Sequence, residues 1–131
     1  MLAYQVIAQV PGQEEAKVKV FANPAKAVIQ LIKWGRSKKF YEVYLHKTGS
    51  LVLLYWNDWL SYLVVTRDLE GADEILPYFR DCTKEVLEKE FKRIRDQKHN
   101  CKCIAAWDCK TGKCEMAYES QVDLNKGVLK L

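Results

Sequence analysis

Residues 39–67 read KFYEVYLHKTGSLVLLYWNDWLSYLVVTR, and this stretch decides the fold class. Strand-forming β-branched and aromatic residues dominate it, while Thr48-Gly49 and Asn57-Asp58 are typical of tight turns. The pattern predicts a three-strand antiparallel β-meander. A second turn of two residues would place Trp56 and Trp59 opposite each other as a cross-strand pair.

Alternation along these strands assigns the side chains to two faces, and both faces are largely apolar. We therefore expect the sheet to be covered on both sides. One face gathers aromatic side chains that would suit base stacking, although burial in a core or an interface explains the same pattern. The residues of this aromatic face are Phe40, Tyr44, His46, Tyr55 and Tyr62.

The chain before the meander is expected to form a hairpin and a helix. Residues 2–10 and 16–22 are rich in strand-forming side chains and flank a Pro-Gly turn. Asn23 then suits a helix N-cap and Pro24 the first helical position, with Gly35 placed as the C-cap.

The chain after the meander is expected to form a second helix and a second hairpin. Apolar residues recur at helical spacing from Gly71 to about Gln97, which predicts one long helix. Pro77 lies inside that span and favours a late start or a first-turn position. Strand patterns at 104–108 and 115–119 then flank a short turn. The sequence shows no internal repeat.

These elements predict a single α+β domain over residues 1–131. It would consist of an antiparallel sheet with a β-meander, one short and one long helix, and a Cys-rich C-terminal β-hairpin. The N-terminus lacks the basic start and long apolar core of a secretory signal, and no run reaches the roughly 18 apolar residues that span a bilayer. We expect a cytoplasmic protein with no membrane partner.

Four cysteines, Cys101, Cys103, Cys109 and Cys114, lie close together near the end of the chain. Thiolates favour zinc, which takes four ligands in a tetrahedron, so a structural zinc site is the leading interpretation. The spacing resembles that of a retroviral zinc knuckle, although the second ligand comes one residue early and the knuckle's histidine and glycines are absent. No nucleic-acid function is carried over from this resemblance. These four cysteines would be the ligands, and the sequence leaves open whether His99 replaces one of them.

The path of residues 104–108 decides between zinc and disulfides. A bend would let four thiolates share one ion, whereas a straight strand would put Cys103 about 20 Å from Cys109. A two-residue turn at Thr111-Gly112 would then set Cys109 opposite Cys114, close to disulfide range. Disulfides in this hairpin and buried free thiols are the two alternatives to zinc.

Positive charge is concentrated in the first half of the chain. Residues 1–60 hold eight Lys and Arg against four Asp and Glu, while the remaining residues hold thirteen of each. Basic and aromatic residues interleave at the end of the first predicted helix, as they do in surfaces that bind phosphates and stack bases. The helix dipole offers a structural reason for the same cations. The candidate nucleic-acid contacts are Lys33, Trp34, Arg36, Lys38 and Lys39.

No catalytic set is predicted, because the two histidines show no catalytic spacing and no glycine-rich phosphate loop is present. The sequence favours a small non-enzymatic binding or regulatory module, with nucleic acid as partner and a cysteine cluster as a structural staple. The alternative is a homo-oligomer that self-associates through its tyrosine and tryptophan surfaces, with a disulfide-stapled C-terminal hairpin.

Overall fold

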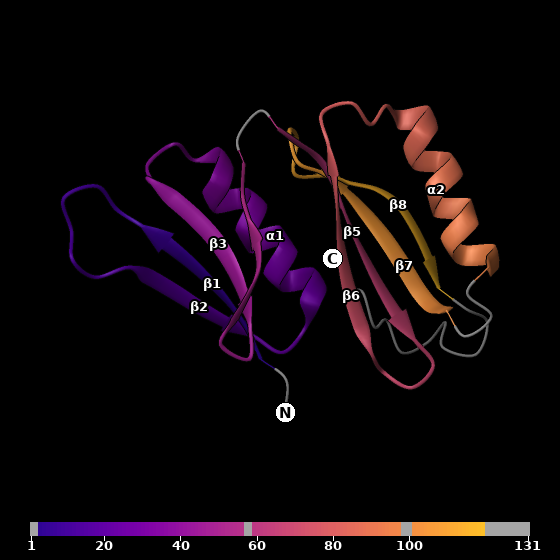
Figure 1. The fold of residues 1–131 in the computed structure, drawn as a ribbon, viewed down its shortest axis with the longest axis horizontal. Coiled ribbons are helices and arrows are strands. Elements are labelled where there is room, and N and C mark those ends of the chain that lie inside the picture. The colour runs from indigo at the N-terminus through magenta and orange to yellow at the C-terminus, as the bar shows by residue number, and fades with distance from the viewer. Residues whose placement is uncertain (1–2, 57–58, 98–100, 120–131) are drawn as a thin grey trace. The chain divides into compact units, whose positions relative to one another are not determined.

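The computed structural model describes residues 3–56, 59–97 and 101–119. The chain divides into two compact units, residues 1–59 and 60–131. Each unit has a four-stranded antiparallel sheet and a helix (Figure 1). The α+β class is confirmed, with two sheets where one was expected, and the single-domain interpretation stays a prediction. Neither helix of the described residues is long and apolar enough to cross a membrane.

The first unit contains β1 (Tyr4–Gln9), β2 (Lys17–Phe21), α1 (Pro24–Arg36), β3 (Glu42–Lys47) and β4 (Ser50–Leu54). The strands lie in the order β2-β1-β3-β4 and all neighbours are antiparallel, so the predicted first hairpin is confirmed. Alternate residues of β1 and β3 are buried on the face that α1 covers. The core of this unit includes Tyr4, Val6, Ala8, Val28, Leu31, Val43 and Leu45.

The start of α1 follows the sequence prediction, but its end does not. The Asn23 side chain accepts a hydrogen bond from the Ala25 amide at 2.8 Å, and Pro24 occupies the first turn. The C-cap is Ser37, so the prediction of Gly35 as C-cap is wrong. Gly35 lies within the last turn, where a Cβ atom would come 2.4 Å from Cδ1 of Tyr55. Glycine is therefore needed there for the close approach of an aromatic ring.

The second unit contains β5 (Leu60–Asp68), β6 (Asp73–Phe79), α2 (Lys84–Gln97), β7 (Cys101–Asp108) and β8 (Cys114–Glu119). Its strands lie in the order β6-β5-β7-β8, again with antiparallel neighbours. One core cluster joins α2 to β5 and β7. This cluster consists of Val64, Leu87, Phe91, Ile94, Ile104 and Ala106.

Both units have the same topology. In each, a hairpin is followed by a helix and a second hairpin, and the first and third strands pair at the centre of the sheet. The sequence shows no matching repeat. Strand pairing and one-sided burial require only that each position be apolar or polar, so two units can share a topology without sharing residues. The duplication is therefore visible in the backbone alone.

The predicted three-strand meander is wrong at its second turn. β3 and β4 pair as expected, but β5 belongs to the second sheet and pairs with β6 and β7. The Trp59 amide does donate to the Trp56 carbonyl at 3.2 Å, but β4 and β5 lie in different sheets, so the two tryptophans are not a cross-strand pair. β5 is buried along most of its length, and a central position satisfies its backbone groups on both edges.

The predicted long helix is wrong over its first part, where β6 forms instead. Pro77 cannot donate a backbone hydrogen bond, but β6 is the outermost strand of its sheet, a position that tolerates proline. The helix begins at Lys84, and Thr83 Oγ1 accepts from the Val86 amide at 3.3 Å, as an N-cap does. With 13 residues in α1 and 14 in α2, the helices are nearly equal in length.

Replacing Gly35 by alanine is expected to destabilise the protein. Alanine favours a helix over glycine by roughly 1 kcal/mol, but its Cβ would meet the Tyr55 ring at 2.4 Å. Overpacking of this kind costs about 1–3 kcal/mol. Urea unfolding should therefore show a lower free energy of unfolding for Gly35→Ala.

The double variant Gly35→Ala/Tyr55→Ala is the matched control, because it removes the ring that the new methyl group meets. Measured against Tyr55→Ala alone, the alanine should then be neutral or stabilising. A single Gly35→Ala variant more stable than the parent would contradict the expected clash.

Candidate nucleic-acid interface

A cluster of lysines and aromatic rings lies where β2 meets the end of α1. Lys17 and Lys19 alternate along β2, on the side of the sheet that carries α1. The Lys17 Nζ atom lies 5.7 Å from the centre of the Phe40 ring, and the Lys19 Nζ atom lies 5.6 Å from that of Trp34. The two rings are themselves 5.6 Å apart and tilted by 51°. These four side chains form one contiguous group with cation–π contacts.

Gln30 restrains Lys19 above the Trp34 ring. The Gln30 side chain belongs to α1 and is buried, and its Oε1 atom accepts a hydrogen bond from Lys19 Nζ at 3.4 Å. The Nε2 atom of the same amide is buried without a hydrogen-bond partner among the described residues. Because the ring contact and the hydrogen bond already restrict the Lys19 side chain, it loses less conformational entropy when it binds an anion.

The residues predicted for nucleic-acid contact lie on one continuous segment. Lys33, Trp34 and Arg36 belong to the last turns of α1, and Lys38 and Lys39 follow in the connection to β3. All four cations of this segment are exposed, and Trp34 is half-buried.

Two cations of the same surface were missed by the sequence analysis. Lys17 and Lys19 lie on β2, well before the predicted segment, and only strand pairing brings them to its aromatic rings. The signal that could have found them is the alternation Lys-Val-Lys-Val at 17–20, which places both lysines on one face of a strand.

The connection after α1 has a defined turn conformation. Lys38 adopts a left-handed backbone with φ of 59°, and Ser37 Oγ accepts from the Lys39 amide at 3.3 Å. This conformation raises the backbone energy of a residue with a Cβ atom by about 1–2 kcal/mol, whereas glycine adopts it freely. The turn therefore places a lysine where local backbone energy favours glycine.

The predicted aromatic face is not assembled, so that prediction is wrong. Tyr44 and His46 lie together on the face opposite α1, with ring centres 5.1 Å apart. Tyr55 packs against Gly35 on the helix side, and Tyr62 packs against the core of the second unit. The predicted face required Tyr62 to lie in the same sheet as Tyr44.

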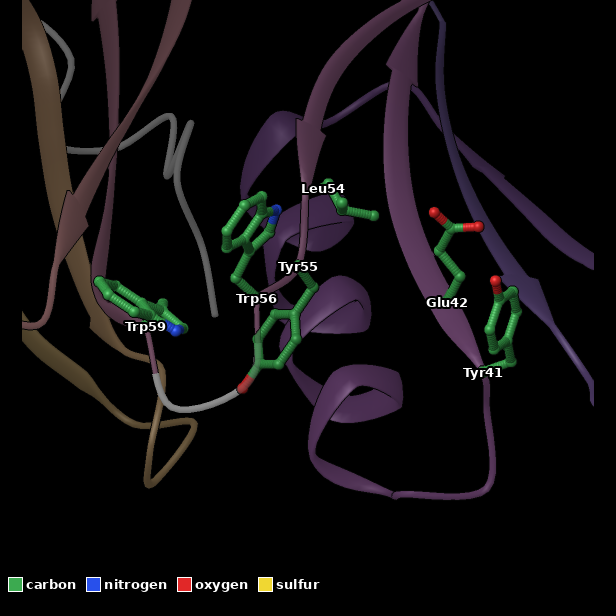
Figure 2. Close-up of a pocket in the computed structure, with 6 residues that line it drawn as sticks. All are labelled: Tyr41, Glu42, Leu54, Tyr55, Trp56 and Trp59. Carbon is green, nitrogen blue, oxygen red and sulfur yellow. The ribbon is translucent and has the colours of Figure 1, made fainter.

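The first unit has a hollow of about 340 Å³ (Figure 2), and its lining residue Tyr41 comes two residues after Lys39 in the chain. Three of its aromatic side chains are largely exposed, at 76% for Tyr41, 51% for Trp56 and 48% for Trp59. Figure 2 shows them arising from the start of β3 and from the chain after β4. The lining residues are Tyr41, Glu42, Leu54, Tyr55, Trp56 and Trp59.

The predicted zinc ligands are spread over β7, the turn after it and the start of β8. β7 is continuous through residues 104–108, so a rise of about 3.3 Å per residue puts Cys103 about 20 Å from Cys109. Zinc–sulfur bonds of about 2.3 Å cannot bridge that separation. Within the described ranges, no three His, Cys, Asp or Glu side chains are grouped to hold a metal ion. The Cys101 side chain and His99 lie outside the described residues, and zinc stays a prediction.

The predicted pairing of Cys109 with Cys114 is wrong. Cys114 lies opposite Trp107, and residues 109–113 form a turn longer than expected. Asp108 stabilises this turn, because its Oδ1 atom accepts from the Lys110 amide at 2.7 Å. The Cys109 amide donates instead to the Ser61 carbonyl at 2.9 Å. No disulfide joins the cysteines whose side chains are described, which are Cys82, Cys103, Cys109 and Cys114.

No protein-family model matches the chain, and comparisons with curated proteins and with solved structures find no match either.

The Cys109 thiol is expected to react with an alkylating reagent only after unfolding. Burial raises its pKa from 9.0 to about 12, and the thiolate is the reactive form. Cys82, which is less buried, is the internal control and should be labelled sooner. Labelling folded and urea-unfolded protein near neutral pH, followed by peptide mass analysis, measures the difference.

The same pKa predicts how stability changes at high pH. The unfolded chain loses the Cys109 proton near 9.0 and the folded protein only near 12, so the free energy of unfolding should fall as pH rises between these values. About one zinc per chain, with Cys109 released for labelling by a chelator alone, would contradict a protonated thiol and support the zinc site.

Proposed function

We propose that the protein binds nucleic acid through the basic rim of its first unit. The proposal is carried by the convergence of two separate chain segments on the same pair of aromatic rings, Trp34 and Phe40. The basic rim consists of Lys17, Lys19, Lys33, Arg36, Lys38 and Lys39 together with these two rings.

The helix dipole does not account for the whole rim. It favours Lys33 and Arg36 in the last turn of α1. It gives no reason for Lys17 and Lys19 on β2, nor for the cations beyond the helix end. None of Lys33, Lys38 and Lys39 forms an ion pair with a carboxylate of the described residues. A surface of exposed cations with aromatic rings among them matches the phosphate backbone and the bases.

The backbone at Lys38 supports the same proposal. Left-handed conformations at residues other than glycine cluster at functional sites, where the side chain is retained despite the local cost. Lys38 lies between the α1 cations and Lys39, so it adds a charge where the helix has already ended.

The double variant Lys38→Gln/Lys39→Gln is expected to bind labelled oligonucleotide more weakly than the parent. Removing two phosphate contacts should reduce the slope of log affinity against log salt by about 1.5. Fluorescence anisotropy across a salt series measures affinity and slope together.

The matched control is Lys110→Gln/Lys113→Gln, which removes the same charge from exposed positions of the β7–β8 turn. This control should keep the slope of the parent. Absence of binding by the parent protein at low salt would overturn the proposed function.

A second candidate function is self-association through the open face of the first sheet. Val18, Val20 and Leu51 are exposed there, on the side opposite α1. Ile7 and Tyr44 lie on the same face and extend its apolar area. Exposed apolar residues gathered on one sheet face favour an interface with a second copy of the chain.

The double variant Val18→Glu/Leu51→Glu is expected to remain a 15.2 kDa monomer at concentrations where the parent associates. Charges introduced on the open face would be desolvated in the interface and would repel each other. Light scattering over a concentration series measures this, with Val86→Glu as an exposed control on α2. A parent protein that stays monomeric throughout would rule out this candidate.

A further inference from the structure

We infer that the hollow beside the basic rim binds one unpaired nucleobase and gives the protein a preference for single-stranded nucleic acid. This inference rests on the proposed nucleic-acid binding and adds to it a base site and a base preference. It uses Tyr41, Glu42, Trp56 and Trp59, none of which belongs to the basic rim.

The aromatic rings of the hollow are exposed in a way that the fold does not require. Tyr41 precedes β3 and contributes little to the core, since three-quarters of its side chain faces solvent. Trp56 and Trp59 are about half exposed on the other side of the hollow (Figure 2). Rings that present open faces around one hollow are suited to stacking with the planar ring of a base.

The basic rim and the hollow are joined by the chain itself. Lys39 is followed by Phe40, which packs on Trp34 in the rim, and then by Tyr41 in the hollow. The Cα atoms of Lys39 and Tyr41 are two residues apart, so they are separated by at most about 7 Å. A phosphate at Lys39 and a base at Tyr41 can therefore belong to the same or adjacent nucleotides. The Tyr41 amide donates to the Gln9 carbonyl at 2.8 Å, which fixes this step of the chain to β1.

Glu42 determines what can occupy the hollow. Its carboxylate lines the same space and only accepts hydrogen bonds, so it repels a phosphate and attracts a donor. An exocyclic amino group, such as N4 of cytosine, is the matching donor on a base edge. The phosphates are thereby directed to the lysines and the base to the hollow. Thymine has no amino group and should bind less tightly than cytosine.

The size of the hollow also favours a single base. About 340 Å³ lies at the small end of the range for small-molecule sites. A paired and stacked base cannot enter it without leaving the duplex, which costs a few kcal/mol. Single strands present the base without that cost, whereas duplex DNA should contact the basic rim alone.

The test compares binding of labelled oligo-dC, oligo-dT and a duplex of equal length to the full chain at one salt concentration. Trp56→Ala is expected to weaken oligo-dC binding about tenfold and to leave duplex binding unchanged, while Trp56→Phe retains a ring and most of the affinity. Glu42→Gln should remove the preference for oligo-dC over oligo-dT. Thermal unfolding of each variant checks that the fold is kept.

The outcomes separate this inference from the function on which it rests. If Lys38→Gln/Lys39→Gln weakens every probe but Trp56→Ala and Tyr41→Ala bind oligo-dC as the parent does, nucleic-acid binding stands and the base site is overturned. Equal affinity of the parent for single strand and duplex would overturn it too. If the parent binds no probe at low salt, the proposed function fails and the base site with it.

Discussion

The antiparallel pairing of the first and third strands is the constraint on which each unit depends. β1 pairs with β3, and β5 with β7, across a connection that contains a hairpin strand and a helix. The register of these strands determines which side chains face the helix. In the first unit, β2 continues that register through Val6 opposite Lys19. A slip of one residue would move both β2 lysines to the other face of the sheet, away from the aromatic rings of the basic rim.

The connection between α1 and β3 places charge and aromatic surface side by side. Lys38 and Lys39 extend the positive charge beyond the helix, Phe40 turns back to pack on Trp34, and Tyr41 begins the hollow. Both ends of this short connection are fixed, by the capping hydrogen bond of Ser37 and by the Tyr41 amide. The proposed contacts for phosphates and for a base therefore depend on the same short segment of backbone.

Local signals in the sequence predicted those parts of the molecule that local energies decide. Asn23 and Pro24 marked the start of α1, and the cations at its end were found from sequence spacing. Long-range pairing decided the rest. The sequence of β5 is compatible with the third strand of a meander, but β5 pairs with β6 and β7. Pro77 is compatible with the first turn of a helix, but it lies in the outer strand β6. Lys17 contacts the rings of the rim only because of the register of β2. The hollow needed residues from two strands and could not be predicted from spacing.

The duplicated topology has a consequence for the order in which the chain folds. The hairpins β1–β2 and β3–β4 close over short sequence distances, and such contacts form within about 1–10 μs. Pairing of β1 with β3 joins residues that are further apart in the chain, so we expect it to form more slowly than the hairpins. Each unit contains both kinds of contact within its own residues. The first half can therefore complete its nucleus on the ribosome while the second half is still being synthesised.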